Sequence, residues 1–512
     1  MPNSDRTAAG LAVSDRTARK RHGAGYPLSR SVASAVFTFW ALALILSLAW
    51  ALVEPRAIFV VLGSAACVIV SVPFVLLRPF QLLSPWTLIV VNVYIGSGAR
   101  SFFVAGGTDG SRTVDELFLG GRPPGFFVGP GLLYLLGLAL LTAGYLLAGR
   151  ARRKPTLMRA VSRRDFHRGA GFVVLAAAAV GFVAFVLYVM QTGGLSLDRI
   201  SGKRTTINGL DLAADYSSHG ELRVLNGFSA VAFWTQLAFY CSRGLRHGLF
   251  TRRGMVLLAL FVNACLLPIY ASSRAEAVYV IVVGVAIELC FRRRIGIARF
   301  MLVSVIVMAV ASALTFLRSH DTSRVAGTEA SPVAIVLDTF VYSRTFTDIP
   351  LSARIIDATP EKLPYKYGET VTGWFAAPIP RSVWPDKPLI STGPEIGNVI
   401  FGNERSGVPP GVIAESYWNF GVIGLITWPL LMGWAVRALQ ERGARYIKGS
   451  ATVALVYSAV IFRVGIDAVS NSLGYAVFSG VQTAVLVGLV LWFATNEARE
   501  RMDAQSVDAP SK

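Results

Sequence analysis

Three arginines stand inside or beside segments that are apolar enough to cross a membrane: Arg100, Arg274 and Arg463. A guanidinium at membrane depth is unfavourable unless it is paired or hydrated, so each arginine is a candidate functional residue. Arg463 has a structural alternative, because Asp467 follows at i+4 on the same helix face and completes an ion pair. Arg100 has another, since its long side chain can reach the surface while its backbone stays in the helix.

Arg274 occupies a short turn between two apolar segments, in the sequence Tyr270-Ala271-Ser272-Ser273-Arg274-Ala275-Glu276. So tight a turn leaves little room for a solvated loop, which favours an anion-binding role for the arginine. The alternatives are pairing with Glu276 or capping of a helix end.

Further basic side chains lie between residues 318 and 410, where Arg344, Arg381 and Lys387 are candidate ligands of an anion. Arg381 and Lys387 stand among the prolines and tryptophans of 373–388, a stretch expected to be irregular and to lie at a membrane interface. A guanidinium presents a planar fork of donors that matches phosphate oxygens, so several converging arginines suit a lipid-linked pyrophosphate. The other loop arginines are expected to be solvated surface charges: Arg318, Arg324, Arg354 and Arg405.

Glu415 is the strongest candidate for a general base, because it stands at the mouth of a predicted membrane helix, where an unpaired carboxylate is unfavourable. The alternative is a structural acid stabilised by the positive end of its own helix. His320 is a weaker candidate base, and Asp386 is expected to pair with Lys387 or Arg381.

Several catalytic signatures are missing from the sequence. The first predicted outer loop, 54–56, has no Asp-Asp, Asp-Glu or Asp-x-Asp pair, which is the metal-binding signature of most transferases of polyprenol-phosphate sugars. The chain also lacks a Walker motif, a Gly-x-Ser-x-Gly and a His-Glu-x-x-His, which leaves an ATPase, a serine hydrolase or a zinc protease without support. We therefore expect no metal and no cofactor.

The composition shows which elements must position these residues. Of the 512 residues, 54% are hydrophobic and only 15% are charged, and apolar windows of about 20 residues, the length that spans a bilayer core, recur along the chain. We predict an all-α polytopic membrane protein with about twelve transmembrane helices and a large extracytoplasmic loop near 318–410. The helices are predicted at 33–53, 57–77, 84–104, 126–148, 170–190, 223–242, 254–270, 277–291, 300–317, 411–436, 450–469 and 474–494.

The net charge of +19 is explained by the side of the membrane on which the basic residues fall, so a nucleic-acid role is not expected. They concentrate in every second gap between predicted helices, most densely at 150–168 and 292–299, which places those gaps and both termini in the cytoplasm. We expect disordered cytoplasmic tails at 1–30 and 496–512, membrane helices at 31–317 and 411–495, and a catalytic loop at 318–410. The four cysteines all fall in predicted spans and are expected to pack as small apolar residues: Cys67, Cys241, Cys265 and Cys290.

Two elements resemble the bacterial oligosaccharide repeat-unit polymerases, the O-antigen polymerase or Wzy-type family. The first is Pro-Ile-Pro-Arg-Ser-x-Trp-Pro-x-Lys-Pro at 378–388, and the second is Glu-Ser-Tyr-x-Asn-Phe-Gly-x-x-Gly at 415–424. The Ser-Ser-Arg turn at 272–274 is also similar. These elements cover roughly a tenth of the chain, and the predicted topology agrees with the family over the rest.

The resemblance implies a metal-independent, inverting glycosyltransferase of the cytoplasmic membrane that joins polyprenyl-pyrophosphate-linked oligosaccharides into a surface polysaccharide. By matching position it assigns Arg274 and Arg381 to the pyrophosphate and Glu415 to the base, with Lys387, Arg344 and Arg463 in second rank. Membrane lipid is an expected partner, and a chain-length regulator and a flippase are candidate ones. Two alternatives stay open, namely an O-antigen ligase or other lipid-linked-sugar transferase, and a flippase or exporter of lipid-linked oligosaccharide. The sugars, the linkage and the oligomeric state do not follow from the sequence.

Overall fold

A computed structural model of the chain describes most of the helical part. The described residues are 27–77, 80–106, 118–148, 156–192, 220–245, 250–271, 273–291, 348–377, 392–402, 408–444 and 450–497, with the single positions 194, 195, 248, 305, 309, 312, 346, 379, 383, 384, 446 and 447. Of the predicted disordered tails, 1–30 and 496–512, residues 1–26 and 498–512 lie outside these ranges, as does most of the predicted helix 300–317. The prediction is wrong for the described ends of the tails, because Leu28 N donates to the Phe80 carbonyl oxygen and residues 496–497 belong to a short strand.

The described chain is mostly helical, which confirms an all-α membrane protein. Among the described residues, eight helical segments are long and apolar enough to cross a membrane, whereas the count of twelve stays a prediction. The eight are α2 (Arg30–Ala51), η1 (Pro55–Ala57) with α3 (Ile58–Leu76), α4 (Pro85–Val93) with η2 (Tyr94–Ala99) and α5 (Arg100–Gly106), η4 (Pro124–Phe127) with α6 (Val128–Leu147), α8 (Ala170–Gln191), α12 (Arg252–Tyr270), α19 (Gly411–Ala444) and α22 (Leu473–Ala494).

The other elements are shorter or more polar. They are α7 (Thr156–Ser162), β1 (Arg164–Phe166), α11 (Gly220–Ser242), α13 (Arg274–Phe291), α16 (Ile349–Ala358), α17 (Glu369–Thr372), η7 (Gly373–Ala376), α18 (Gly393–Phe401), α20 (Ala451–Val456), η8 (Tyr457–Ile461), α21 (Phe462–Ser470) and β2 (Thr495–Glu497). Two of them, α11 and α13, together with the series α20 to α21, coincide with predicted spans.

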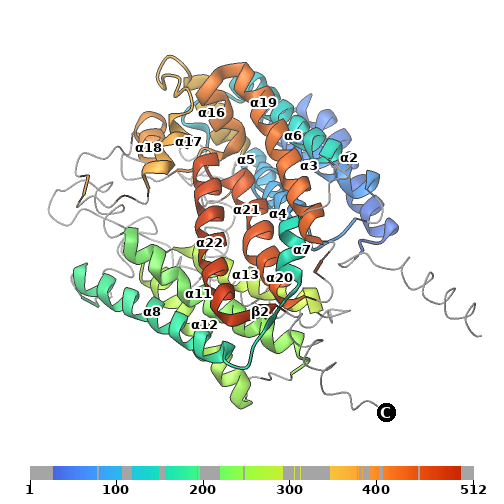
Figure 1. Ribbon diagram of the computed structural model, residues 1–512. Coiled ribbons are helices and arrows are strands. Elements are labelled where there is room, and N and C mark those ends of the chain that lie inside the picture. The colour runs from blue at the N-terminus through green and yellow to red at the C-terminus, as the bar shows by residue number, and fades with distance from the viewer. Residues whose placement is uncertain are drawn as a thin grey trace, which may run out of the picture.

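The helices form two groups, each around its own apolar core. One group contains α2, α3, α4, α6 and α19, and its core includes Trp86, Tyr134 and Leu425. The other contains α8, α11, α12, α13 and α22, with a core that includes Trp234 and Val487. In Figure 1 the first group lies at the upper right and α8, α11 and α12 lie at the lower left, with α22 between them.

Helices α16, α17 and α18, with η7, gather at one end of the molecule beside the start of α19 (Figure 1), and we call them the cap. Their apolar core joins Leu351 and Ile355 of α16 and Ile396 of α18 to Ala414 and Trp418 of α19. At the opposite end, β1 pairs antiparallel with β2 just beyond α22. The cap therefore belongs to the predicted large loop, and it folds onto the membrane helices.

Helix α19 is broken near its beginning, so the prediction of one continuous helix over 411–436 is wrong at this point. Gly421 has φ 58° and ψ −141°, a conformation that residues with a Cβ atom rarely adopt. The segment 411–419, which we call the arm, then folds back beside the rest of α19. A Cβ atom on Gly424 would collide with the Ser416 carbonyl oxygen, and one on Gly137 of α6 would lie 2.6 Å from Ile413 and 3.0 Å from Leu425.

Candidate functional site

Glu415 lies on the arm and is fully buried. Its carboxylate oxygen Oε2 accepts a hydrogen bond from the backbone N–H of Leu473 at 2.5 Å, where Leu473 is the first residue of α22. Among the described residues, the other oxygen, Oε1, has no hydrogen-bond partner. The structure thus orients the carboxyl group through Oε2, with the Thr370 side chain beside it, and Oε1 is buried.

The carboxylate occupies the positive end of a helix other than its own. Ser472 caps α22 by accepting from Tyr475 N, and Glu415 satisfies the N–H of Leu473, which has no partner within the helix. The positive N-terminus of α22 also favours a negative charge at this place. The expected alternative, an acid stabilised by its own helix, is therefore replaced by a contact between two distant segments.

Asn419 lies one turn after Glu415 and fixes the end of the arm to the cap. Its amide nitrogen donates to the Thr370 hydroxyl and to the Glu415 carbonyl oxygen, each at 2.8 Å, and its Oδ1 accepts from Gly368 N at 2.8 Å. The break at Gly421 would leave carbonyl groups at the end of the arm without intrahelical partners. Lys366 N and Tyr367 N satisfy two of them, the carbonyls of Trp418 and Asn419.

The first turn of α22 joins Glu415 to Arg463. Two residues after Leu473, the Tyr475 hydroxyl accepts from Arg463 Nη2 at 3.4 Å. Arg463 also donates through Nε to Asp467 Oδ2 at 3.0 Å, which confirms the ion pair expected at i+4. Its guanidinium carbon lies 4.3 Å from the centre of the Tyr279 ring, in a cation–π arrangement.

Arg274 is placed near this region by its helix. It is the first residue of α13, and Tyr279, which stacks under Arg463, lies five residues further along the same helix. The placement of the Arg274 side chain lies outside what the structure describes. Three other candidates lie outside the described residues: Arg344, Arg381 and Lys387.

Arg100 does not reach the surface, and the interpretation that it extends to water is wrong. Only 1% of its side chain is exposed, and its Nη1 forms an ion pair with Asp348, which is 3% exposed. The same nitrogen donates to the Phe346 carbonyl oxygen at 3.2 Å. Asp348 also caps α16 by accepting from Leu351 N at 2.6 Å, so the pair joins α5 to the first turn of the cap.

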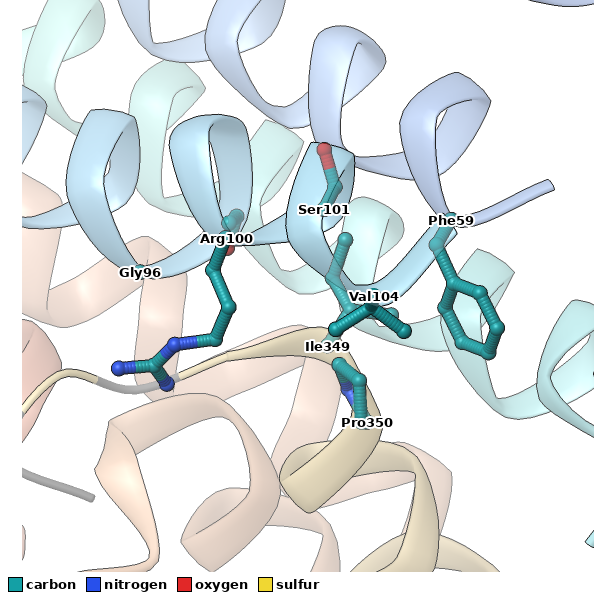
Figure 2. Close-up of a pocket in the computed structure, with 8 residues that line it drawn as sticks. Phe59, Gly96, Arg100, Ser101, Val104, Ile349 and Pro350 are labelled. Carbon is teal, nitrogen blue, oxygen red and sulfur yellow. The ribbon is translucent and has the colours of Figure 1, made fainter. Parts of the chain in front are cut away.

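A hollow of about 10 Å³ lies beside this pair, roughly the space of a single water molecule. Figure 2 shows Arg100 and Val104 of α5 on one side of it, with Ile349 and Pro350 of α16 on the other. It is too small for a sugar or a phosphate, which indicates that this ion pair joins helices rather than binding substrate.

Arg354 is also not the solvated surface charge that was expected. It lies half-buried on α16, donates to the Ile400 carbonyl oxygen of α18 and stacks 4.6 Å from the Phe401 ring. Burial lowers the pKa of its guanidinium, and the nearby Arg122 lowers it further. Its contacts hold the helices of the cap together.

Asp348 is not among the candidate residues predicted from the sequence, although it caps α16 and pairs with Arg100. A signal for Asp348 exists, because Asp followed by Ile349 and Pro350 is a typical helix start, with the acid as cap and proline in the first turn. Asn419 belongs to the Glu-Ser-Tyr-x-Asn-Phe-Gly-x-x-Gly element at 415–424, but no local pattern shows its contacts, because two of its partners lie some fifty residues earlier in the chain.

No family model, curated protein or solved structure matches this chain. Within the described ranges, no group of three or more His, Cys, Asp or Glu side chains is placed to hold a metal ion. The groups present there are a buried carboxyl group oriented through one oxygen and a guanidinium connected to it through the first turn of α22.

Proposed function

We propose that the protein is a glycosyltransferase that polymerises polyprenyl-pyrophosphate-linked oligosaccharide repeat units, with the cap on the outer face of the cytoplasmic membrane and both termini in the cytoplasm. The observation that carries this proposal is the state of Glu415. One oxygen is fixed by Leu473 and the other is without a partner among the described residues, as a positioned general base requires. The resemblance of 378–388 and 415–424 to the polymerase family supports the substrate class.

In the proposed reaction, a hydroxyl group at the non-reducing end of the acceptor attacks the anomeric carbon of the donor chain. A new glycosidic C–O bond forms as the bond between that carbon and the pyrophosphate oxygen breaks. Glu415 Oε1 takes the proton of the attacking hydroxyl, and the lipid pyrophosphate leaves with the electron pair of the broken bond. Attack from the opposite side inverts the configuration.

The developing negative charge falls on the departing pyrophosphate. Guanidinium groups stabilise it more in the transition state than in the ground state, which is what accelerates the reaction. Arg463 is held by Asp467 and Tyr475 in a fixed orientation, and Arg274 stands at the start of α13. In the proposal these two arginines bind the pyrophosphate from the helices, and Arg381, Lys387 and Arg344 do so from the loop.

The test is Glu415→Gln, compared with Glu441→Gln. The amide retains an oxygen that accepts from Leu473 N, but it cannot take a proton. The loss of a general base typically lowers the rate by about 10²–10⁴-fold. The control, Glu441, lies on the same helix, where it pairs with Arg437 at 2.6 Å.

Each variant is expressed in a strain that lacks the chromosomal copy, and polymer length is measured per unit of membrane-inserted protein. Single repeat units on lipid from Glu415→Gln, and normal polymer from Glu441→Gln, are expected. Normal polymer from Glu415→Gln at equal abundance would contradict the proposal. Normal polymer that is not attached to its final acceptor in the deletion strain would instead identify a ligase, and lipid-linked units trapped inside the cell would identify a flippase.

A further inference from the structure

Four aromatic side chains form a continuous row from the cap onto α19: Tyr365, Tyr367, Phe420 and Trp428. The centres of neighbouring rings are 6.0, 6.5 and 5.4 Å apart along the row. Tyr367 is 74% exposed and Phe420 is 37% exposed, so the middle of the row presents its rings outward. We call these four side chains the aromatic row.

The backbone beneath the row is fixed in place. Three consecutive N–H groups, those of Lys366, Tyr367 and Gly368, donate to the end of the arm, where Trp418 and Asn419 accept them. Tyr367 has φ 45°, in the left-handed region that tyrosine rarely adopts. An aromatic ring that serves only to anchor the protein among lipid headgroups does not need a fixed backbone. A binding site does benefit, because a side chain that is already in position costs less entropy when the ligand binds.

The row adjoins the proposed base. Asn419, whose carbonyl and side chain hold Tyr367 and Gly368, donates to the carbonyl of Glu415 one turn earlier. From there the rings extend in two directions, with Trp428 on the apolar part of α19 and Tyr365 in the loop before α17. The order of the rings, from the apolar helix to the loop, matches a lipid-linked oligosaccharide, in which the hydrocarbon chain lies in the membrane and the sugars lie outside it.

We propose that the aromatic row is a carbohydrate-binding platform that holds the oligosaccharide of one lipid-linked repeat unit beside Glu415. Pyranose rings have apolar faces of C–H groups that pack on the faces of aromatic rings, and the tyrosine hydroxyls hydrogen-bond to sugar hydroxyls at the edges. The inference rests on the proposed function for the identity of the substrate, but binding to the row requires no catalysis.

The test uses the full chain in lipid nanodiscs and a probe without lipid or pyrophosphate: oligosaccharide fragments from partial acid hydrolysis of the cell's own surface polysaccharide. Binding is measured by saturation-transfer difference NMR. Tyr367→Ala is expected to weaken binding about tenfold, whereas Tyr367→Phe, which keeps the ring, stays close to wild type. The matched control is Phe375→Ala, since Phe375 is 78% exposed in η7 and lies outside the row.

Membrane-inserted abundance is measured first for every variant. If Tyr367→Ala does not accumulate, Tyr367→Leu, which has apolar bulk but no π face, must show the same loss of binding. Equal binding by Tyr367→Ala and wild type, or a loss that Phe375→Ala shares, would overturn the platform. Reduced membrane insertion of Tyr367→Ala together with normal fragment binding by Tyr367→Leu would assign the row to headgroup anchoring and also overturn the platform.

The two proposals fail separately. If the fragments bind at Tyr367 but Glu415→Gln forms normal polymer, the platform stands and the assignment of the base is wrong. If Glu415→Gln abolishes polymer but the row binds no fragment, the base stands and the platform is wrong.

Discussion

Asp348 and Glu415 are both buried carboxylates where the cap meets the membrane helices, and they differ in how they are satisfied. Asp348 is paired with Arg100 and also accepts from Leu351 N, so it has a full counter-charge and a helix to cap. Glu415 accepts from the N–H of Leu473 and has the neutral Thr370 side chain beside it, and no cation contacts it among the residues that the structure describes.

The difference separates an acid that maintains the structure from one that is available for chemistry. Removing one partner of a buried ion pair leaves the other charge uncompensated, so the loss of such an acid lowers the stability of the fold. A buried carboxylate without a counter-ion is itself unfavourable, and the fold gains little from keeping it charged. Asp467 resembles Asp348, since it is paired with Arg463 and also accepts from Ser479 and Asn471.

The largest effect is expected from Asp348→Ala. It removes the counter-charge of Arg100 and the cap of α16 together, and breaking such a pair typically destabilises by about 3–5 kcal/mol. The thermal midpoint of unfolding in detergent and the membrane-inserted abundance should both fall, and activity should fall in step with abundance. The double variant Arg100→Met with Asp348→Leu should recover much of the loss, because no buried charge remains unpaired. Unchanged stability of Asp348→Ala would remove the contrast with Glu415.

An intermediate effect is expected from Asp467→Asn. The amide has nearly the same shape and still has polar atoms for Ser479 and Asn471, but the ion pair with Arg463 is lost. A hydrogen bond to a charged group is worth about 1.5–3 kcal/mol, which sets the expected loss of unfolding free energy. The same thermal measurement applies, with Ser479→Ala as the control that leaves the ion pair intact. An unchanged thermal midpoint would separate Asp467 from the acids that maintain the structure.

The smallest effect on stability is expected from Glu415→Gln. The change removes a buried charge that has no counter-ion and keeps an acceptor for Leu473 N, so the unfolding free energy should change by less than about 1 kcal/mol. The thermal midpoint should match the wild type, even though activity is lost. A midpoint as low as that of Asp348→Ala would show that Glu415 maintains the structure and would weaken its assignment as a base.

Hydropathy predicted the apolar helical segments that the structure describes, whereas the full count of twelve stays a prediction. The span predicted at 170–190 corresponds to α8, Ala170–Gln191, and the one predicted at 474–494 corresponds to α22, Leu473–Ala494. These agree because a run of apolar residues in a bilayer has one regular conformation that satisfies all its backbone groups. Hydropathy could not show the break in α19, since the apolar pattern continues through Phe420 and Gly421.

The candidate site was only partly predictable, because several of its contacts join residues that are far apart in the sequence. The pairing of Arg463 with Asp467 follows from helix geometry alone, since i and i+4 share a face. The partner of Arg100 is 248 residues away, and the hydrogen-bond donor to Glu415 is 58 residues away. No local pattern specifies such contacts, so the sequence identified Glu415 as a candidate but not the group that orients it.

The folded-back arm has a consequence for how the protein is made. At about 1.5 Å per residue the arm is far shorter than a bilayer core, so it cannot insert as an independent span. Its carboxylate meets the N–H of Leu473 only after the ribosome has produced α22. The site thus forms only once α22 has been synthesised, and a chain that stops before α22 has no oriented Glu415.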